Sequence, residues 1–187
     1  MAAYKKKRPI FTQRKPMKNL SSIKALVPDY AKDAYLDLDI AVLRSEFSML
    51  EALGIALAAA FAAKSRYLVN AIKPLISKEE ADAALAAASI ASTDSIHYPY
   101  TEISGLNHYP ATDNQSKIKT YLDRNGISQQ TFELFALAAS IVSKCKHSIQ
   151  SHYQSLKKDK LTDKQLKNVG EIAAAVYAIA HVIAVEQ

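Results

Sequence analysis

A nine-residue segment, Lys144–His152, gathers the side chains of this sequence that are best suited to nucleophilic and acid–base chemistry. It holds the only cysteine of the chain, Cys145, together with Ser148, His147 and His152. Residues three or four positions apart share one face of a helix, so we expect Cys145, Ser148 and His152 to line one side. His147 would point elsewhere. A helix that begins near Cys145 would aim free N–H groups and its positive dipole end at the sulfur, which favours the reactive thiolate.

A further candidate is Glu133, an acid in an otherwise apolar helical pattern twelve residues before Cys145. A buried carboxylate is costly unless a partner compensates it, and a histidine is the natural partner. Glutamate, histidine and thiol would then form a proton relay. Two less reactive interpretations stay open. A buried cysteine is usually an inert small hydrophobe, and Glu133 could instead satisfy N–H groups in the first turn of a helix. One cysteine and two nearby histidines leave a zinc ligand set incomplete.

Ala-rich segments with almost no glycine or proline predict the helices that must position these residues, in an all-α fold. The expected helices start at about Pro28, cover 48–75, 77–95 and 117–124, run from Ser128 to Lys158 with an interruption near Ser143-Lys144, and continue from Thr162 to the C-terminus. Residues 97–113, which contain two prolines and a glycine, predict a loop. Helix starts are marked by two sequences with capping-box spacing, Ser77 with Glu80 and Thr162 with Gln165.

A weak internal repeat divides the sequence into two related helical halves. Glu51 and Glu133 each open an Ala-rich helix, and each helix is followed by a capping box and a second Ala-rich helix. Twelve residues after Glu51 stands Ala63, whereas twelve after Glu133 stands Cys145. Only the second half therefore holds the reactive side chains, and packing the two halves together would bury both apolar faces.

The charge of the chain lies in its N-terminal segment. The net charge is +6, but the first 24 residues hold eight basic and no acidic residues, so the remainder carries −2. We expect a disordered basic tail over 1–17 and a single helical domain over 18–187, and nucleic-acid binding is unlikely for a body that is not basic. The longest apolar runs, 52–63 and 172–185, fall short of the roughly 18 residues of a membrane span. The single cysteine fits a reducing, cytoplasmic compartment.

The spacing of Glu133, Cys145, His147 and His152 resembles the alkyl hydroperoxide reductase D (AhpD) family, within the carboxymuconolactone decarboxylase-like superfamily. Members carry a glutamate, a Cys-x-x-Cys motif that begins twelve residues later, and a histidine four residues after its second cysteine. Ser148 stands where that second cysteine belongs. Residues 26–33 and the order of the helical segments are also similar, so the resemblance covers about residue 17 to the end.

This resemblance implies an AhpD-like helical bundle of two related halves, assembled as a homotrimer. It implies a cytoplasmic antioxidant enzyme that reduces the peroxiredoxin AhpC and has weak peroxidase activity of its own. Its electrons would come from dihydrolipoamide on a dehydrogenase-complex acyltransferase, with no bound cofactor or metal. Glu133 and His152 would form the proton relay through water. The residue at 148 would be oxidised to sulfenic acid, and Cys145 would resolve it as a disulfide.

Ser148 is the main departure from the family pattern. A serine hydroxyl forms neither a sulfenic acid nor a disulfide, so this chain alone cannot complete the family cycle. Because the other motif residues are retained, we favour an engineered Cys-to-Ser variant, impaired in turnover, over a natural single-cysteine protein. Two alternatives are a carboxymuconolactone decarboxylase-like enzyme, whose chemistry needs no cysteine pair, and a non-catalytic helical oligomer whose basic tail binds nucleic acid or a membrane.

Overall fold

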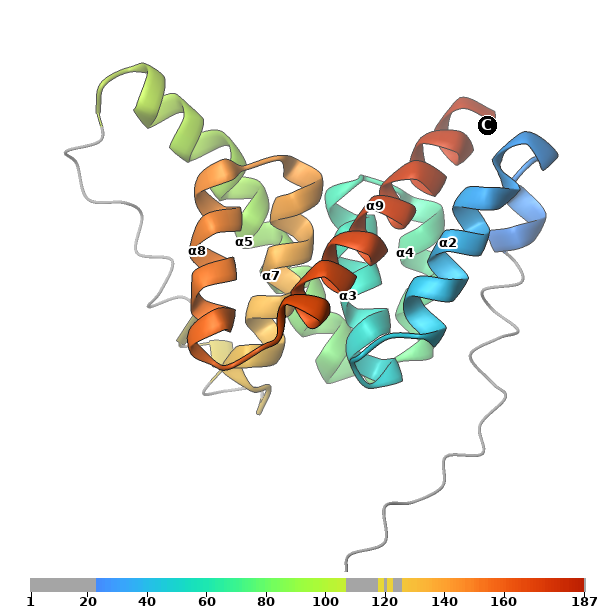
Figure 1. Cartoon of the computed structure of the whole chain (residues 1–187). Coiled ribbons are helices and arrows are strands. Elements are labelled where there is room, and N and C mark those ends of the chain that lie inside the picture. Colours follow the sequence, from blue (N-terminus) through green and yellow to red (C-terminus); the bar gives the residue numbers. More distant parts are fainter. Residues whose placement is uncertain (1–22, 107–117, 120, 123–125, 187) are drawn as a thin grey trace, which may run out of the picture.

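The computed structural model describes residues 23–106, 118–119, 121–122 and 126–186, and within these ranges the chain is helical and without strands (Figure 1). The elements are η1 (Asp29–Ala31), α2 (Lys32–Leu43), α3 (Met49–Ala62), α4 (Arg66–Ile72), η2 (Lys73–Leu75), α5 (Lys78–Ile103), α7 (Gln129–Ser143), α8 (Lys146–Lys158) and α9 (Asp163–Glu186). The predicted all-α fold is confirmed. The predicted tail, residues 1–17, lies outside the described residues, as do 107–113 of the predicted loop and half of the predicted helix over 117–124.

Both predicted capping boxes begin helices. The Ser77 hydroxyl accepts from the Glu80 N–H before α5, and the Glu80 carboxylate accepts from the Ser77 N–H. Thr162 and Gln165 make the same reciprocal bonds before α9. A third box, Ser48 with Glu51, opens α3. Glu51 is thus a helix-capping acid, which distinguishes it from Glu133.

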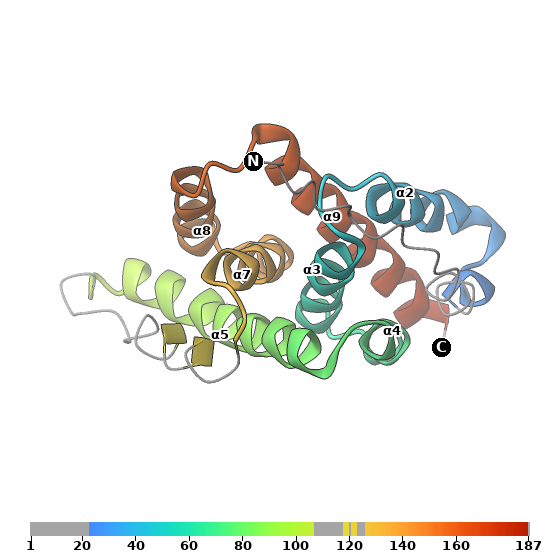
Figure 2. The same ribbon diagram turned by 90° about the horizontal axis from the view of Figure 1, so that it is seen from below.

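The centre of the molecule is the pair α3 and α7, which lie side by side with α5 and α9 on either side of them (Figure 2). Residues 52–60 of α3 and 132–140 of α7 are all buried. Gly54 permits this close approach, because a Cβ there would lie only 2.4 Å from ring atoms of Phe135. The packing of the two halves therefore depends on a missing side chain in the first half and a large one in the second.

A sharp backbone break follows the central helix of each half. Lys64, after α3, and Lys144, after α7, both adopt left-handed conformations, with φ of 58° and 57°. The next residue, Ser65 or Cys145, then serves as the N-cap of a new helix, α4 or α8. The predicted continuous helix over 48–75 is therefore wrong: it is interrupted at 63–65. The interruption predicted near Ser143-Lys144 is confirmed.

These breaks lie 80 residues apart and give the register of the repeat. The backbone hydrogen bonds agree, since Ser65 N donates to Ala60 O at 3.0 Å and Cys145 N donates to Ser140 O at 3.2 Å. The predicted register, which set Ala63 opposite Cys145, is wrong by two residues because Glu51 is a capping acid with no counterpart in Glu133. In the corrected register Leu53 stands opposite Glu133.

Helix α5 continues beyond its predicted end at Ser95 and runs through Pro99 to Ile103. Its last turns extend away from the rest of the body (Figure 1), with Ile96 and Ile103 exposed. Proline frees the carbonyl four residues earlier, and at such an exposed helix end water can satisfy that group. The expectation of a loop from residue 97 was therefore wrong for 97–103.

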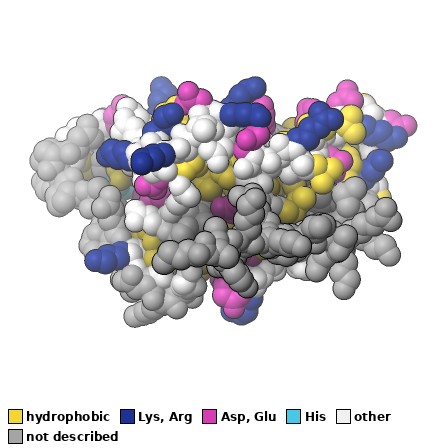
Figure 3. Space-filling view, turned by 60° about the horizontal axis from the view of Figure 1, so that its bottom comes forward, with side chains coloured by type: hydrophobic (Ala, Val, Ile, Leu, Met, Phe, Trp, Pro, Cys, Tyr) yellow, Lys and Arg dark blue, Asp and Glu magenta, His cyan; other side chains and the backbone are white. Residues whose placement is uncertain are grey.

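Charged side chains of both signs are interspersed on the face shown in Figure 3. Lysine and arginine side chains lie close to acidic ones there. Over the molecule as a whole, the described residues form the ion pairs Lys78–Asp82, Lys157–Asp163 and Lys164–Glu46, among others. On this face the described body thus presents no extended surface of one sign.

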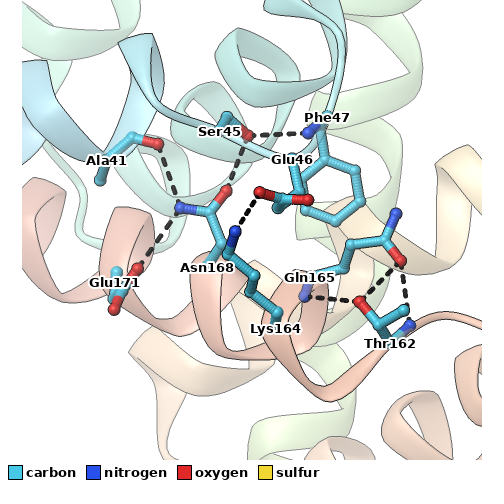
Figure 4. A network of polar contacts seen from close by, with 9 residues as sticks. All are labelled: Ala41, Ser45, Glu46, Phe47, Thr162, Lys164, Gln165, Asn168 and Glu171. Atoms are coloured by element: carbon cyan, nitrogen blue, oxygen red, sulfur yellow. Dashed lines mark hydrogen bonds and ion pairs between the residues drawn. The ribbon is translucent and has the colours of Figure 1, made fainter.

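Helix α9 is joined to α2 by a buried polar network around Asn168 (Figure 4). The Asn168 amide donates to Ala41 O at 3.1 Å, and its carbonyl accepts from the Ser45 hydroxyl at 2.7 Å. By length and composition α9 is the one helix in the described ranges that could cross a membrane. Half of its most apolar stretch is buried inside the protein, and it packs against α2, α3 and α7, so its composition also suits a core helix.

Candidate functional site

Cys145 lies at the junction of α7 and α8, where it is the N-cap residue of α8. The left-handed Lys144 turns the chain there, and the Ile149 N–H donates to the Cys145 carbonyl at 2.9 Å to begin the new helix. The residue is only 3% exposed. The structure therefore places the single thiol at a helix start, as its sequence context predicted, but beneath the surface.

Two groups contact the Cys145 sulfur. The Ser148 hydroxyl oxygen lies 3.2 Å from Sγ, and the Asp94 carbonyl, from α5, lies 3.7 Å away and accepts from the thiol. Cys145 makes no side-chain cap to the first turn of α8. In the first half, by contrast, the Ser65 hydroxyl accepts from the Leu68 N–H at 3.4 Å. The first-turn N–H groups of α8 thus make no hydrogen bond to the side chain of their N-cap residue.

Glu133 and His152 form a buried pair between α7 and α8. His152 Nδ1 lies 2.7 Å from Glu133 Oε2, and each side chain is about one-tenth exposed. An ionised carboxylate only accepts hydrogen bonds, so the imidazole donates through Nδ1 and its Nε2 is left to accept or release a proton. Glu133 is the fifth residue of α7, which rules out the alternative that it satisfies N–H groups of the first turn.

A further polar group, the Ser140 hydroxyl, lies on the same face of α7 as Glu133, because seven residues make two helical turns. It is fully buried, and among the described residues it has no hydrogen-bond partner. The corresponding residue in α3 is Ala60. A buried hydroxyl without a partner costs free energy, and a bound water is one common way to satisfy it.

His147 lies apart from the Cys145, Ser148 and His152 face, as its helical position predicted. It is exposed, and its ring stacks on Tyr98 of α5 with 3.8 Å between ring centres. Burial, together with the nearby charges of Asp94 and Cys145, raises the pKa of the Tyr98 phenol above its ordinary value of 10.0. Tyr98 therefore remains a neutral hydroxyl near the thiol at neutral pH.

Asp94 and Tyr98 are parts of this site that sequence reasoning missed. Their spacing of four residues places them on one face of α5, but the helix was expected to end at Ser95. Asp94 carried the signal that identified Glu133, an acid within an Ala-rich helix, and it is 7% exposed. That signal could have found it.

Positive charge borders the buried thiol on one side. Lys144 and Lys146 flank it in sequence and are exposed, and the Lys144 ammonium lies 5.5 Å from the centre of the Tyr177 ring. Among the described residues, no group of three or more His, Cys, Asp or Glu side chains is arranged to hold a metal ion.

Comparison with known proteins places this arrangement in context. Residues 114–186 match the model of the carboxymuconolactone decarboxylase family. The chain is 31% identical to alkyl hydroperoxide reductase AhpD of Maricaulis maris over 172 residues, covering 90% of this chain and 99% of that protein. It is 30% identical to AhpD of Coxiella burnetii (strain RSA 493) over 174 residues, covering 89% and 98%. AhpD of Hyphomonas neptunium is 28% identical over 172 residues, covering 90% and 95%.

Proposed function

The chain belongs to the alkyl hydroperoxide reductase AhpD family, and on that premise we propose that it is a thiol-based antioxidant enzyme of the AhpD type. In this proposal it is a cytoplasmic thiol–disulfide oxidoreductase that reduces a peroxiredoxin of the AhpC kind. Its electrons come from dihydrolipoamide carried by a dehydrogenase-complex acyltransferase. The similarity extends over nine-tenths of the chain, which favours this activity over a decarboxylase, whose family model matches only residues 114–186.

The observation that carries the proposal is the Glu133–His152 pair, whose histidine lies one helical turn beyond position 148 in α8. With a cysteine at 148, His152 would accept the thiol proton directly or through a water, and Glu133 would stabilise the resulting imidazolium. Cys145 lies 3.2 Å from the side chain at 148, so its sulfur is placed to displace the oxidised group and form a disulfide.

Ser148 interrupts that cycle at one step. Cys145 can still attack an external disulfide, forming a mixed disulfide and releasing one thiolate, but no second thiol in the chain can resolve it. The chain with Ser148 is therefore impaired in dithiol turnover, although the proton relay is intact.

The test is to replace Ser148 with cysteine. With lipoamide, lipoamide dehydrogenase and an AhpC-type peroxiredoxin, Ser148→Cys should consume NADH in a peroxiredoxin-dependent reaction when peroxide is added, and the unmodified chain should show no such peroxiredoxin-dependent consumption. Leu68→Cys is the matched control, because Leu68 occupies the equivalent buried position of α4 beside Ser65. It should gain no activity. Adding Glu133→Gln to Ser148→Cys should slow turnover by about 10²–10⁴-fold, the range of general acid–base catalysis.

An inactive Ser148→Cys variant with unchanged helicity would count against the AhpD mechanism, as would equal turnover by the unmodified chain.

A homotrimer forms part of the same proposal. Exposed apolar side chains on α2 and on the end of α5, such as Leu36, Ile40 and Ile103, are suited to contacts between copies. Sedimentation equilibrium should give the mass of three chains, and a mass of one chain would contradict this part.

A further inference from the structure

We infer that in this chain Cys145 itself reduces hydroperoxides, with the Ser148 hydroxyl as the hydrogen-bond donor to its sulfur and a small external thiol as the reductant. The inference rests on the AhpD-type thiol chemistry proposed above. In the cycle proposed for a cysteine at 148, the sulfur at 148 reacts with peroxide. In the inferred cycle, Cys145 reacts instead, and only one cysteine takes part.

The first support is the pair of donors available to the sulfur. Ser148 is the third residue of α8, so both its side-chain O–H and its backbone N–H lie where an N-cap side chain accepts hydrogen bonds. The hydroxyl already lies 3.2 Å from Sγ. The backbone at this kind of break lets a cap side chain reach the third N–H, since Ser65 Oγ does so in α4 at 3.4 Å.

A neutral thiol is a weak acceptor and leaves that cap position unfilled, whereas a thiolate is a strong one. Ionisation of Cys145 would therefore give the sulfur two hydrogen bonds and complete the N-terminal cap of α8. A serine at 148 suits this role better than a second thiol, because a hydroxyl is the stronger donor.

The second support is a set of buried groups suited to proton transfer, which a purely structural cysteine would not need. The Glu133–His152 pair lies one turn from Ser148 in a buried environment, and the Ser140 hydroxyl on the same face of α7 is without a partner among the described residues. Buried polar groups of this kind are costly to retain in a helical core. A water held by these groups would connect His152 to the Ser148 hydroxyl and the sulfur.

The reaction consumes one peroxide and two external thiols in each cycle. The Cys145 thiolate attacks one peroxide oxygen, the O–O bond breaks, and an S–O bond forms, which oxidises the sulfur by two electrons and reduces an alkyl hydroperoxide to its alcohol or hydrogen peroxide to water. The proton first lost by the thiol, held on His152, passes to the departing alkoxide or hydroxide. An external thiol then displaces the hydroxyl of the sulfenic acid as water and leaves a mixed disulfide. A second external thiol releases Cys145 and departs as a disulfide.

Burial of the two positions favours small reactants in this one-cysteine reaction. Cys145 is 3% exposed and Ser148 is 2% exposed. Hydrogen peroxide and short alkyl hydroperoxides, with monothiols such as 2-mercaptoethanol, are therefore the chemical classes that this sulfur would accept.

The experiment treats the full-length protein with hydrogen peroxide in the presence of dimedone, which traps sulfenic acid, and follows the adduct at Cys145 by mass spectrometry. One adduct per chain is expected, together with continuous peroxide consumption when 2-mercaptoethanol replaces dimedone. Ser148→Ala should slow adduct formation by roughly ten- to a hundredfold, which is the value of a hydrogen bond to a charged group. Ser148→Thr, which keeps a hydroxyl, should recover much of the rate.

The two halves of the molecule supply a matched control. The double variant Ser65→Cys/Cys145→Ser moves the thiol to the equivalent N-cap of α4, which has Leu68 and Ile72 in place of Ser148 and His152. Its adduct should form at least about tenfold more slowly, if the polar partners rather than the helix start activate the sulfur.

Equal rates for the two thiol positions, or an unchanged rate in Ser148→Ala, would overturn the assigned roles. If the unmodified chain resists oxidation while Ser148→Cys cycles with lipoamide, the one-cysteine inference is wrong and the proposed function stands. If neither reacts, both are wrong. Should the double variant fail to fold, the Ser148→Ala rate decides.

Discussion

The two halves of this molecule share an order of elements and differ in their interiors. Each contains a central helix, a left-handed lysine, an N-cap residue, a shorter helix and a long outer helix. The side chains at four equivalent buried or part-buried positions differ: Leu53, Ser65, Leu68 and Ile72 in the first half, and Glu133, Cys145, Ser148 and His152 in the second. The helix break is thus part of the fold, whereas only the second half places reactive side chains beside it.

The comparison separates features of the fold from features of the site. A left-handed lysine beside a cysteine invites the interpretation that strain activates the thiol. Because Lys64 has the same conformation beside Ser65, that strain belongs to the helix–helix turn. The Glu133–His152 pair has no counterpart in the first half, so it is the better indication of function.

The largest effect is expected from placing the acid of the second half into the first. Leu53→Glu would bury a carboxylate in the first half, where Ile72 stands at the position equivalent to His152 and leaves it without a histidine partner. It should lower the free energy of unfolding by about 3–5 kcal/mol, the cost of an uncompensated buried charge. Urea denaturation measures this, with Leu53→Met as the control for packing. A loss below about 1 kcal/mol would mean that the first half already accommodates polar groups.

In the reverse exchange, the loss of stability should depend on whether one or both residues of the Glu133–His152 pair are replaced. His152→Ile leaves Glu133 unpaired and should cost roughly 3 kcal/mol, the lower end for a broken buried pair because both side chains are slightly exposed. Adding Glu133→Leu recreates the first-half interior and should return stability to within about 1 kcal/mol of the original. If the double variant is as unstable as the single one, the pair is a structural requirement and the functional interpretation weakens.

The contact that joins the halves should tolerate little added volume. A methyl group from Gly54→Ala would lie 2.4 Å from the Phe135 ring. Overpacking of this kind costs about 1–3 kcal/mol, which the better helix propensity of alanine only partly offsets. Combining it with Phe135→Leu should cost less than the sum of the two single changes, as a double-mutant cycle in urea would reveal. Strict additivity would show that the ring moves aside freely.

The smallest effect is expected from replacing the left-handed lysine of each half, and it should be the same in both halves. Lys64→Gly and Lys144→Gly each relieve an unfavourable left-handed residue and should each stabilise the protein by about 0.5–1 kcal/mol. Thermal melting would compare them. Unequal gains, or loss of thiol reactivity in Lys144→Gly with unchanged stability, would show that the second break is adapted to the site after all.

Sequence patterns predicted the helical class, the order of the helices and the starts of α5 and α9, because capping boxes and Ala-rich periodicity are local signals. They missed the break at Lys64, since neither glycine nor proline marks a left-handed lysine that tertiary packing imposes. The repeat was recognised, but its register was taken from the two glutamates, which serve different purposes.

For the candidate site, sequence reasoning grouped the residues of one helix but could not supply contacts from another element. Helical spacing grouped Cys145 with Ser148, and in the structure Cys145 Sγ lies 3.2 Å from Ser148 Oγ. The structure also pairs Glu133 with His152 rather than His147. Asp94 and Tyr98 reach the thiol from α5, more than forty residues earlier in the chain, and Pro99 had suggested that this helix was already over.

The contacts of the site span very different lengths of chain, and this has a consequence for the order of folding. Glu133 and His152 are 19 residues apart, within the α7–α8 hairpin, whereas Cys145 and the Asp94 carbonyl are 51 apart. Short closures generally form before long ones, because less chain entropy is lost. The acid–histidine pair can therefore assemble while the thiol is still uncovered. Until α5 docks, Cys145 of a newly made chain lacks its contact with the Asp94 carbonyl and is more exposed than in the finished protein.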